Sequence, residues 1–533
     1  MIRLFQVKCV SENEIEAQIL KKLRIRKEDL LQWHVHRKSV DARHQKVLFS
    51  YVVDCKVKNE KKLLKLKDVS LTPDETYHPV MSGEHALSAR PIVVGFGPAG
   101  MFAALILAQY GYKPIVLERG SNVDVRKQKV ETFWENGILD EECNVQFGEG
   151  GAGAFSDGKL TTRSKDALCR KVLEELVSFG AKPDILMDQH PHIGTDAFLS
   201  IIRNCRKEIE RLGGTFYFDT KLEDIKVENG ILKQIYFNHQ WMDCNALILA
   251  TGHSASDTIL MLHKHGMHIE NKPFAVGVRI EHKQKYINEA MLHEYSQDER
   301  LIPARYQLTY TASNSKGVYT FCMCPGGFVA PAASSSRQVV VNGMSPSNRG
   351  SRWANSGMVV EIRPEDYSEL MKHEEMAVSK DSPLALMAFQ ERLEELCWLN
   401  GGMKQTAPAQ RMVDFVNKKN SFDLPESSYT PGLLASPLHF WMPEFVTGRL
   451  REGFRHFGKV SRGFLTNDAV MIGVETRTSS PVRILRDKES YQHITLKGLF
   501  PCGEGAGYAG GIVSAAIDGE RCAEGVAGYL SLV

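Results

Sequence analysis

The segment from Pro91 carries the residues whose types and spacing point most directly to chemistry. It reads PIVVGFGPAG, so Gly95, Gly97 and Gly100 form a GxGxxG pattern directly after a β-branched run. In such a pattern the first glycine makes a tight turn and the second lets the backbone approach a pyrophosphate. The third lets the next helix pack closely on the strand. Free N–H groups at the start of that helix bind negative charge. The segment therefore predicts a dinucleotide site.

A carboxylate follows at a suitable spacing. Residues 114–117 predict a second strand, which ends in Glu118, eighteen residues after Gly100. An acidic side chain there can accept hydrogen bonds from both ribose hydroxyls, which suits the free 2′-hydroxyl of FAD or NAD and disfavours NADP. The alternative is a glycine turn in an α/β domain that binds no nucleotide.

Two further motifs favour FAD over NAD. A strand expected at residues 246–249 runs into Ala250-Thr251-Gly252 after a meander of short strands. This stretch resembles the ATG motif of the glutathione-reductase-like flavoproteins. GLFPCGEG, with Gly503 and Glu504, resembles the closing Gly-Asp motif of that class, with glutamate in place of the usual aspartate. The class uses that acid to hydrogen-bond the ribitol.

A glycine-rich turn follows the closing motif and leads into a helix expected at residues 512–529. Its N-terminus would point at the flavin, where a positive dipole stabilises the charge that develops on reduction. The alternative is a buried C-terminal helix with no cofactor.

Residues 146–163, QFGEGGAGAFSDGKLTTR, are dense in glycine. Such a backbone can lie against a flat ring or a phosphate, and Ser156, Lys159 and Thr161 offer donors. The segment resembles loops that line the isoalloxazine in related flavoproteins; the alternative is a surface loop.

GGAGAFSDGKLTTR, FCMCPGG, NGMS, ETRTSSPVRI and PCGEGAGYAGGIVSAAIDG together resemble the family of uncharacterised bacterial FAD-dependent dehydrogenases, from about Arg90 to Val533. The resemblance implies FAD and a fold but no substrate. The motifs assign to the cofactor Gly95, Phe96, Gly97, Pro98, Ala99, Gly100, Glu118, Arg119, Gly153, Ser156, Asp157, Gly158, Lys159, Leu160, Leu222, Thr251, Gly252, Gly503, Glu504, Gly510, Gly511 and Ile512.

The candidates for the substrate side are Lys159, Arg477 and Arg483. The two arginines lie on a segment just before the closing motif, and on an extended chain their even spacing places them on one face. They could clamp a carboxylate or phosphate, or they could form ion pairs that tie two domains together. Both interpretations stay open at the level of the sequence.

Cys322 and Cys324 are the one close pair among 11 cysteines. On a strand they would face one side with Cα atoms ~6.6 Å apart, at the edge of disulfide geometry. Cys324 is therefore a candidate for redox chemistry with the flavin, and two packed thiols are the alternative. The other cysteines and the histidines show no spacing typical of a metal site, so none is expected.

The elements around these motifs predict an α/β fold. We expect a Rossmann-type, glutathione-reductase-like FAD-binding domain in three chain segments, an inserted α+β substrate domain and a small α+β N-terminal domain. The expected divisions are residues 1–85 for the N-terminal domain, 86–262 for the first FAD part, 263–480 for the substrate domain and 481–533 for the closing FAD part. Residues 71–89 are expected to form a linker.

Composition limits the partners. The formal net charge is +2 over 533 residues, and no segment approaches the ~20 apolar residues that cross a bilayer. We therefore expect a cytoplasmic protein with no membrane partner, and composition says nothing of its oligomeric state. Residues 1–80 carry 17 lysines and arginines against 11 aspartates and glutamates, so a nucleic-acid partner is conceivable. The charge balance favours the alternative, a solvated small domain packed on the enzyme, and nucleic acid is not the expected partner.

The motifs favour a two-electron FAD oxidoreductase that acts on a small, anionic molecule. The sequence has no second GxGxxG with a strand and a helix around it, so NAD(P)H is expected only as a transient electron donor. Two alternatives remain: an FAD-dependent RNA-modifying enzyme that grips RNA with residues 1–85, and a flavin-binding redox sensor without catalysis.

Overall fold

The computed structural model describes residues 1–41, 47–75, 77, 89–162, 164, 166–298, 300–372, 376 and 378–530. The chain divides into two compact units. One comprises Met1–His78 and Lys159–Ile193, and the other comprises Pro79–Gly158 and Gly194–Val533. The expected linker falls mostly outside the described residues, and the domain boundaries expected from the sequence stay a prediction.

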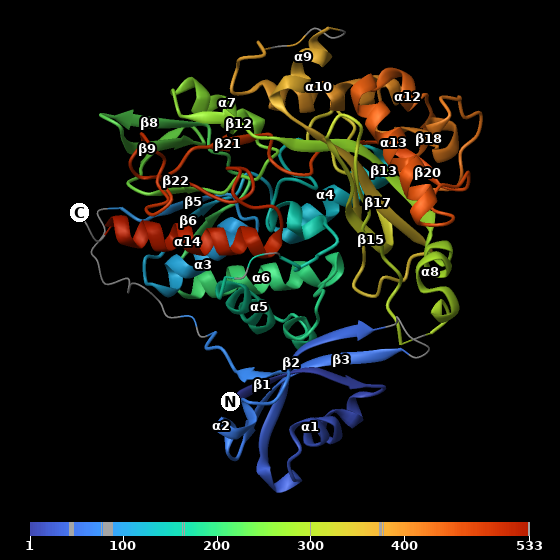
Figure 1. Cartoon of the computed structure of the whole chain (residues 1–533). Coiled ribbons are helices and arrows are strands. Elements are labelled where there is room, and N and C mark those ends of the chain that lie inside the picture. The colour runs from blue at the N-terminus through green and yellow to red at the C-terminus, as the bar shows by residue number, and fades with distance from the viewer. Residues whose placement is uncertain are drawn as a thin grey trace. The chain divides into compact units, whose positions relative to one another are not determined.

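The first unit contains a four-stranded sheet in the order β2-β3-β1-β4 (Figure 1). Helix α1 buries Ile15, Ile19 and Leu23, as their spacing predicts. The sequence did not predict the long strand β2, because its side chains do not alternate regularly between buried and exposed. The elements of this unit are β1 (Ile2–Cys9), α1 (Ile15–Leu23), β2 (Leu30–Asp41), β3 (Leu48–Val57), α2 (Glu60–Leu63), β4 (Val69–Leu71) and α5 (Leu168–Ser178).

A five-stranded parallel sheet organises the second unit, in the order β22-β11-β5-β6-β7. Its strands are β5 (Ile92–Val94), β6 (Ile115–Leu117), β7 (Thr215–Tyr217), β11 (Leu247–Leu249) and β22 (Leu499–Pro501). All but the edge strand β7 are short apolar runs buried on both faces, as parallel strands between helices must be. The C-terminal strand thus completes a sheet that begins some 400 residues earlier, and the Rossmann-type α/β fold predicted from the motifs is confirmed.

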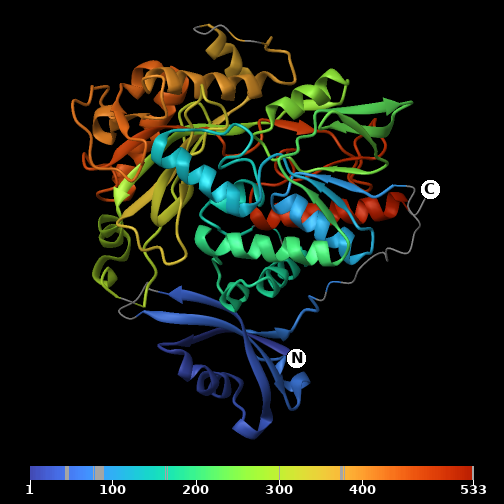
Figure 2. The ribbon, with the colours of Figure 1, turned by 180° about the vertical axis from the view of Figure 1, so that it is seen from behind.

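Helices α3 (Pro98–Gln109), α6 (Thr195–Arg211) and α14 (Ile512–Leu530) lie side by side in this unit (Figures 1 and 2). Helix α3 buries ten consecutive residues, from Ala99 to Ala108, because it packs on the sheet and on α14. A Cβ at Gly519 of α14 would lie 2.1 Å from the carbonyl oxygen of Ala99. Only a glycine there allows the two helices to approach so closely.

A second, mostly antiparallel sheet of eight strands occupies most of residues 274–475. Its order is β14-β15-β17-β13-β20-β18-β19, and β16 pairs with β15. Helices α10 (Ala385–Asn400) and α13 (Glu444–Val460) pack against this sheet and share its hydrophobic core. The strands are β13 (Phe274–Lys283), β14 (Thr309–Thr311), β15 (Gly317–Pro331), β16 (Val341–Met344), β17 (Trp353–Ile362), β18 (Ala407–Arg411), β19 (Leu433–Ala435) and β20 (Val470–Glu475).

The helices between these strands are α8 (Gln284–Leu292), α9 (Pro364–Met371), α10 (Ala385–Asn400), α11 (Met412–Val416), α12 (Leu438–Trp441) and α13 (Glu444–Val460). The smaller elements of the second unit are α4 (Val123–Asn136), β8 (Asp224–Glu228), β9 (Ile231–Phe237), β10 (Gln240–Asp243), α7 (Ser256–Lys264), β12 (Ile269–Asn271) and β21 (Val482–Ile484). Strands β8 to β10 form the expected meander, and positive φ angles at Asn229 and Gly230 confirm the tight turn between β8 and β9. Among the described residues, no helix has the length and apolar character that a membrane crossing needs.

Arg126 of α4 holds the start of the glycine-rich segment in place. Its fully buried guanidinium donates to four backbone carbonyls, those of Asn144, Val145, Gly148 and Glu149, at 2.7–3.1 Å. Burial lowers the pKa of Arg126 to about 10, so the charge is retained at neutral pH. Gly148 has a φ of +118°, and a Cβ there would lie 2.4 Å from the Cδ of Arg126. The segment therefore wraps directly around this side chain.

We expect Arg126→Met to lower the free energy of unfolding by at least about 3 kcal/mol, because several buried carbonyls would lose a charged donor at once. Urea unfolding followed by circular dichroism measures the change. Lys127→Met is the matched control, since Lys127 is exposed and pairs with the exposed Glu131 at i,i+4; its effect should stay within about 0.5 kcal/mol. Equal effects of both substitutions would contradict this role of Arg126.

Candidate functional site

The carboxyl ends of four neighbouring parallel strands bring the expected motifs to one edge of the sheet. Gly95 follows β5, Glu118 follows β6, Gly252 lies just beyond β11, and Gly503 lies just beyond β22. Ligands of open α/β sheets bind outside this edge. The structure therefore assembles the GxGxxG, ATG-like and closing motifs into one site, although they are far apart in the sequence.

The glycines of the first motif permit contacts that a side chain would prevent. Gly95 has a φ of +92°, and a Cβ on it would lie 2.4 Å from the carbonyl oxygen of Ala250. A Cβ on Gly100 would lie 1.8 Å from the carbonyl oxygen of Gly95. Gly97 caps α3, and Pro98 is its first residue, where a missing N–H costs nothing. The tight turn and the close packing of helix on strand are as the sequence predicts.

Glu118 is buried, and its carboxylate accepts three backbone hydrogen bonds. The N–H of Phe96 donates to one oxygen at 2.8 Å, and the N–H groups of Gly120 and Gly148 donate to the other at 3.0 and 2.9 Å. A carboxylate offers about four acceptor positions, so roughly one remains for a ligand hydroxyl. The sequence did not show that this side chain also fixes the loops around it.

The glycine-rich segment packs on the starts of both helices. A Cβ on Gly151 would lie 2.7 Å from the Cα of Gly97. A Cβ on Gly153 would lie 3.1 Å from Pro98 of α3 and 3.5 Å from Ile512 of α14. Ser156 ends this stretch, and its carbonyl oxygen accepts a hydrogen bond from the hydroxyl of Thr195 at 2.7 Å. Three glycine motifs therefore meet where α3 and α14 begin.

The closing motif is held by an ion pair that the sequence did not reveal. Asp518 of α14 accepts a hydrogen bond from the N–H of Gly503 at 2.7 Å. It also forms a bidentate pair with Arg486, at 2.5 and 2.9 Å. Arg486 also donates to the carbonyl of Pro501 at 2.7 Å. Cys502, Asp518 and Cys522 are close enough together to suggest metal ligands, but the guanidinium of Arg486 already lies against Asp518 and Cys522. That group is therefore a structural clamp.

Glu504, expected at the ribitol, has two basic neighbours. The Nδ1 atom of His253 lies 3.3 Å from a carboxylate oxygen of Glu504, and the Nε2 atom of His253 is buried with no hydrogen-bond partner among the described residues. Burial and the Arg483 guanidinium lower the pKa of Lys272, and the Glu504 carboxylate raises it. His253 directly follows Gly252 in the ATG-like motif, and that position was the signal that could have identified it.

A dinucleotide such as FAD fits this edge. A Cβ built on Gly252, Gly510 or Gly511 would meet no atom within 4 Å, so open space adjoins each of these backbones. The N–H groups that open α3 and α14 present positive partial charge to the same region. Glu118 and Glu504 provide acceptors at two separate positions, as the two sugar portions of FAD require.

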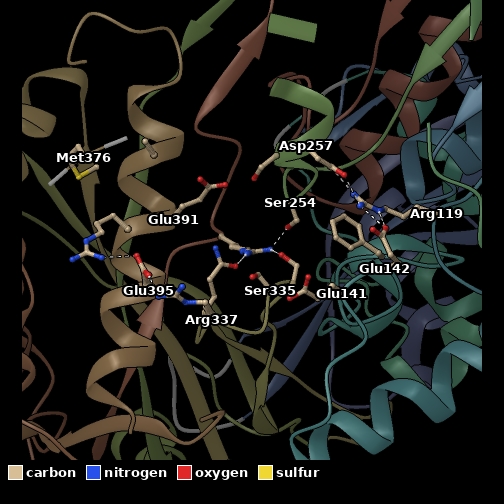
Figure 3. A pocket seen from close by; sticks show the side chains of 17 residues that line it. Arg119, Glu141, Glu142, Ser254, Asp257, Ser335, Arg337, Met376, Glu391 and Glu395 are labelled. Carbon is tan, nitrogen blue, oxygen red and sulfur yellow. Dashed lines mark hydrogen bonds and ion pairs between the residues drawn. The ribbon is translucent and has the colours of Figure 1, made fainter. Parts of the chain in front are cut away.

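Arg477 lines a cavity of about 580 Å³ at the carboxyl ends of β6 and β11 (Figure 3). Figure 3 shows Arg119, Glu142 and Asp257 on one side of it and Glu391 and Glu395 of α10 on the other. Burial raises the pKa of Glu391, and the neighbouring Glu394 adds to that effect. Arg119 pairs with both Glu142 and Asp257 and lies 4.1 Å from the centre of the Phe147 ring.

All five N–H groups of Arg477 are engaged. They donate to both carboxylate oxygens of Glu394, to the hydroxyls of Ser254 and Ser334, and to the amide oxygen of Gln338, at 2.7–3.2 Å. No donor is left for a substrate anion. These contacts favour the interpretation of Arg477 as an ion pair that joins segments of the chain.

Arg483 lies against the closing motif and pairs with a carboxylate of its own. A Cβ on Gly507 would lie 3.1 Å from the Cα of Arg483. Its guanidinium is 3.4 Å from Glu270 of the neighbouring strand β12, and its side chain is 39% exposed. Arg477 and Arg483 therefore have separate carboxylate partners rather than one shared anion site.

The strand geometry expected for Cys322 and Cys324 is wrong in detail. A β-bulge in β15 interrupts the ladder between Phe321 and Cys324, and Cys322 has a φ of +44°. The two sulfur atoms lie 4.0 Å apart and form no disulfide, and that of Cys324 contacts the carbonyl oxygen of Cys322 at 3.2 Å. The bulge, which the sequence does not reveal, turns the side chains out of regular alternation.

Lys159 and Leu160 belong to the first unit. The backbone of Lys159 forms an isolated β-bridge with His192, and Leu160 is buried. Their assignment to the cofactor stays a prediction, as do those of Asp157, Gly158, Leu222 and Thr251. Leu222 is buried just before β8, and its neighbour Lys221 pairs with Glu142 and Asp257.

Comparisons with known proteins agree with these motifs. Residues 273–478 match the model of an FAD-dependent protein, C-terminal domain-like, and residues 1–56 match a domain of unknown function. A relative from Clostridium beijerinckii, described as an uncharacterized protein, is 46% identical over 521 residues, which cover 96% of this chain and 95% of the relative.

Solved structures match more distantly. Glycine oxidase from Geobacillus kaustophilus is 11% identical, with a TM-score of 0.32, over 83% of this chain and 94% of that one. The FrdA subunit of E. coli quinol fumarate reductase is 11% identical, with a TM-score of 0.36, over 83% of this chain and 70% of that one. Likeness this remote supports no inference about substrate.

We expect Glu118→Gln to weaken FAD binding at least about tenfold, because an amide presents an N–H to at least one of the three backbone donors and loses the charge that a ribose hydroxyl would meet. The flavin absorbance that remains bound after dialysis measures the loss. Glu210→Gln is the control, since that glutamate is exposed and pairs with Arg206 on the same helix. Flavin retention equal to that of the wild type would contradict the assignment.

We expect Asp518→Asn to release flavin as well, and to destabilise the fold by about 3 kcal/mol, because Arg486 would keep a buried charge without its partner. Thermal unfolding and the flavin content of the purified variant are the two measurements. Glu524→Gln, one turn and a half further along α14 and paired with Arg521, should retain both properties. Normal flavin content in a destabilised Asp518→Asn protein would contradict the prediction, because it would show that the Arg486–Asp518 pair stabilises the fold without shaping the cofactor site.

Proposed function

We propose that this chain, which belongs to the family of FAD-dependent proteins, is an oxidoreductase that transfers a hydride between the flavin N5 atom and a small anionic substrate. FAD supplies the redox chemistry, and the protein supplies binding, orientation and electrostatics. We also propose NAD(P)H as the electron donor, which would bind only transiently.

The observation that carries this proposal is the meeting of four motifs at one sheet edge. Gly97, Glu118, Gly252 and Gly503 follow four adjacent strands. A Cβ on Gly503 would lie 2.7 Å from the Cβ of Ala99, whereas a Cβ on Gly252 would face open space. A second glycine segment packed on the first, and two helices whose N-termini face the same region, are features of a dinucleotide site. An α/β domain that binds no nucleotide does not need them.

At the adenosine end, α3 and Glu118 would do the binding. The N–H groups of Ala99 and Gly100 would donate hydrogen bonds to pyrophosphate oxygens, because helix N-termini stabilise negative charge. The remaining acceptor position of Glu118 would receive a ribose hydroxyl. A 2′-phosphate would meet this buried carboxylate and be repelled, which favours FAD over any 2′-phosphorylated cofactor in this site.

At the flavin end, Glu504 and the start of α14 would have distinct tasks. Glu504, held beside His253 and Lys272, would accept hydrogen bonds from the ribitol chain. The N-terminus of α14 would stabilise the negative charge that reduction places near it. His253 would keep Glu504 oriented, so His253 is a positioning residue.

The purified protein should show the absorption bands of oxidised flavin, and anaerobic NADH or NADPH should bleach them. Stopped-flow absorbance under nitrogen measures both the extent and the rate of bleaching. Dithionite serves as the control, because it reduces any accessible flavin whatever the natural donor is.

Each outcome has a definite meaning. Bleaching by one nucleotide identifies the donor. Flavin that only dithionite bleaches would remove the nucleotide from the proposal and leave a dehydrogenase reduced by its own substrate. Protein that takes up no flavin on reconstitution with FAD would refute the proposed function.

A further inference from the structure

Cys322 and Cys324 lie in an irregular part of strand β15. The register of β15 against β17 shifts twice, once between Phe321 and Cys324 and again between Cys324 and Gly327. Cys322 has a φ of +44°, in the left-handed region that a residue with a Cβ rarely adopts. Residues two apart on a regular strand have Cα atoms ~6.6 Å apart and parallel side chains, whereas the two sulfur atoms here lie 4.0 Å apart. The irregular backbone therefore brings the two thiols together, and backbone of this kind is typical of functional sites.

The two thiols differ in their access to solutes. Cys322 is partly exposed, whereas Cys324 is buried. All 11 cysteines lie in the described part of the chain, and Cys169 is the one other cysteine that is partly exposed. A small solute that reaches Cys322 therefore meets a thiol with a second thiol directly behind it. Cysteines that sense oxidants have this arrangement, in which an accessible sulfur reacts first and a neighbouring sulfur then displaces the added oxygen.

A fully buried guanidinium lies against the cysteine pair. The Nη1 atom of Arg279 donates to the carbonyl oxygen of Cys322 at 2.9 Å, and the Sγ atom of Cys324 contacts the same oxygen at 3.2 Å. Glu475 binds the Nε atom of Arg279 at 2.7 Å, so the Nη1 atom is the part of the guanidinium that faces the cysteines. A cation beside a cysteine favours the thiolate, which is the form of the side chain that attacks an oxidant.

Asn355 of β17 places a further donor opposite Cys324. The two residues are cross-strand partners, and such partners have their side chains on the same face of a sheet. The Oδ1 atom of Asn355 accepts a hydrogen bond from Arg279 at 3.1 Å. Its Nδ2 atom is buried and has no hydrogen-bond partner among the described residues. A buried N–H without an acceptor costs free energy, and a thiolate or a sulfenic oxygen at the cysteine pair would supply that acceptor.

We infer that Cys322 and Cys324 form a reversible oxidation site, at which hydrogen peroxide converts the two thiols into a disulfide. In the first step the Cys322 sulfur attacks one peroxide oxygen: the O–O bond breaks, an S–O bond forms, and the thiol proton leaves with the second oxygen as water. In the second step the Cys324 sulfur attacks the Cys322 sulfur: the S–O bond breaks, the S–S bond forms, and the Cys324 proton leaves with the hydroxyl group as water. Two thiols and one peroxide thus give one disulfide and two waters, and a dithiol reductant reverses the change.

Mass spectrometry of the purified full-length protein, after exposure to hydrogen peroxide under nitrogen, tests the inference. The remaining thiols are alkylated in denaturant with N-ethylmaleimide before digestion. We expect the peptide that contains Cys322 and Cys324 to lose two hydrogen atoms and both alkylation sites, and dithiothreitol to restore both sites. Cys322→Ser should abolish this change. Cys324→Ser should leave a sulfenic acid on Cys322, which dimedone traps at least about tenfold more than in the wild type, because no second thiol displaces the oxygen.

Other cysteines of the chain serve as controls in the same experiment. The sulfur atoms of Cys502 and Cys522 lie within 4.8 Å of each other, but both residues are buried and Arg486 contacts Cys522. These two cysteines should stay fully alkylated, because closeness without access to the oxidant is not sufficient. Cys169→Ser removes the other partly exposed thiol and should leave formation of the disulfide unchanged.

Full alkylation of Cys322 and Cys324 after exposure to peroxide would overturn the inference. A sulfinic acid on Cys322 of the wild type, with Cys324 still alkylated, would overturn it as well. Equal loss of alkylation at Cys502 and Cys522 would show that oxidation follows closeness alone, and would remove the special role of this pair. Should Cys324→Ser fail to fold, the wild type and Cys322→Ser decide the question. Since no readout depends on reduction of a flavin, the inference stands or falls separately from the proposed function.

Discussion

One buried carboxylate determines the shape of the cofactor edge. Glu118 accepts hydrogen bonds from the N–H groups of Phe96 in the first glycine turn, of Gly120 just beyond β6, and of Gly148 at the start of the second glycine segment. Burying a charge is costly unless hydrogen bonds replace its water, and here three backbone donors do so. Arg126 binds the carbonyls of the same glycine segment. Glu118 thus binds a backbone N–H of the second glycine segment, and Arg126 binds backbone carbonyls of the same segment. Together the two side chains fix its position.

Close approach of backbones follows from that fixed stretch. Gly151 meets Gly97, Gly505 meets the carbonyl of Gly252, and Gly519 meets Ala99. At each of these points a methyl group would displace a segment that carries the site. The glycines therefore act together: they bring two helix starts and four strand ends within reach of one extended ligand. The ion pair of Arg486 and Asp518 then secures the last of these strands, because Asp518 also binds the N–H of Gly503.

The sequence predicted those parts of the fold whose signals are local. Strand β5 and helix α3 are where the pattern around Gly95 and Gly97 places them, and α14 follows its glycine turn. The eight-stranded sheet was missed as a sheet, since its neighbours β13, β17 and β20 lie up to about 200 residues apart in sequence. The bulge at Cys322 was missed because register is a property of the pair of strands, not of one strand.

Arginines show most clearly why site residues resist prediction from sequence alone. Arg477 and Arg483 were attractive because they precede the closing motif, yet each has a carboxylate partner from a distant segment. The chemical availability of a charge therefore depends on what the fold places around it, and a sequence motif does not show which distant carboxylate will face an arginine.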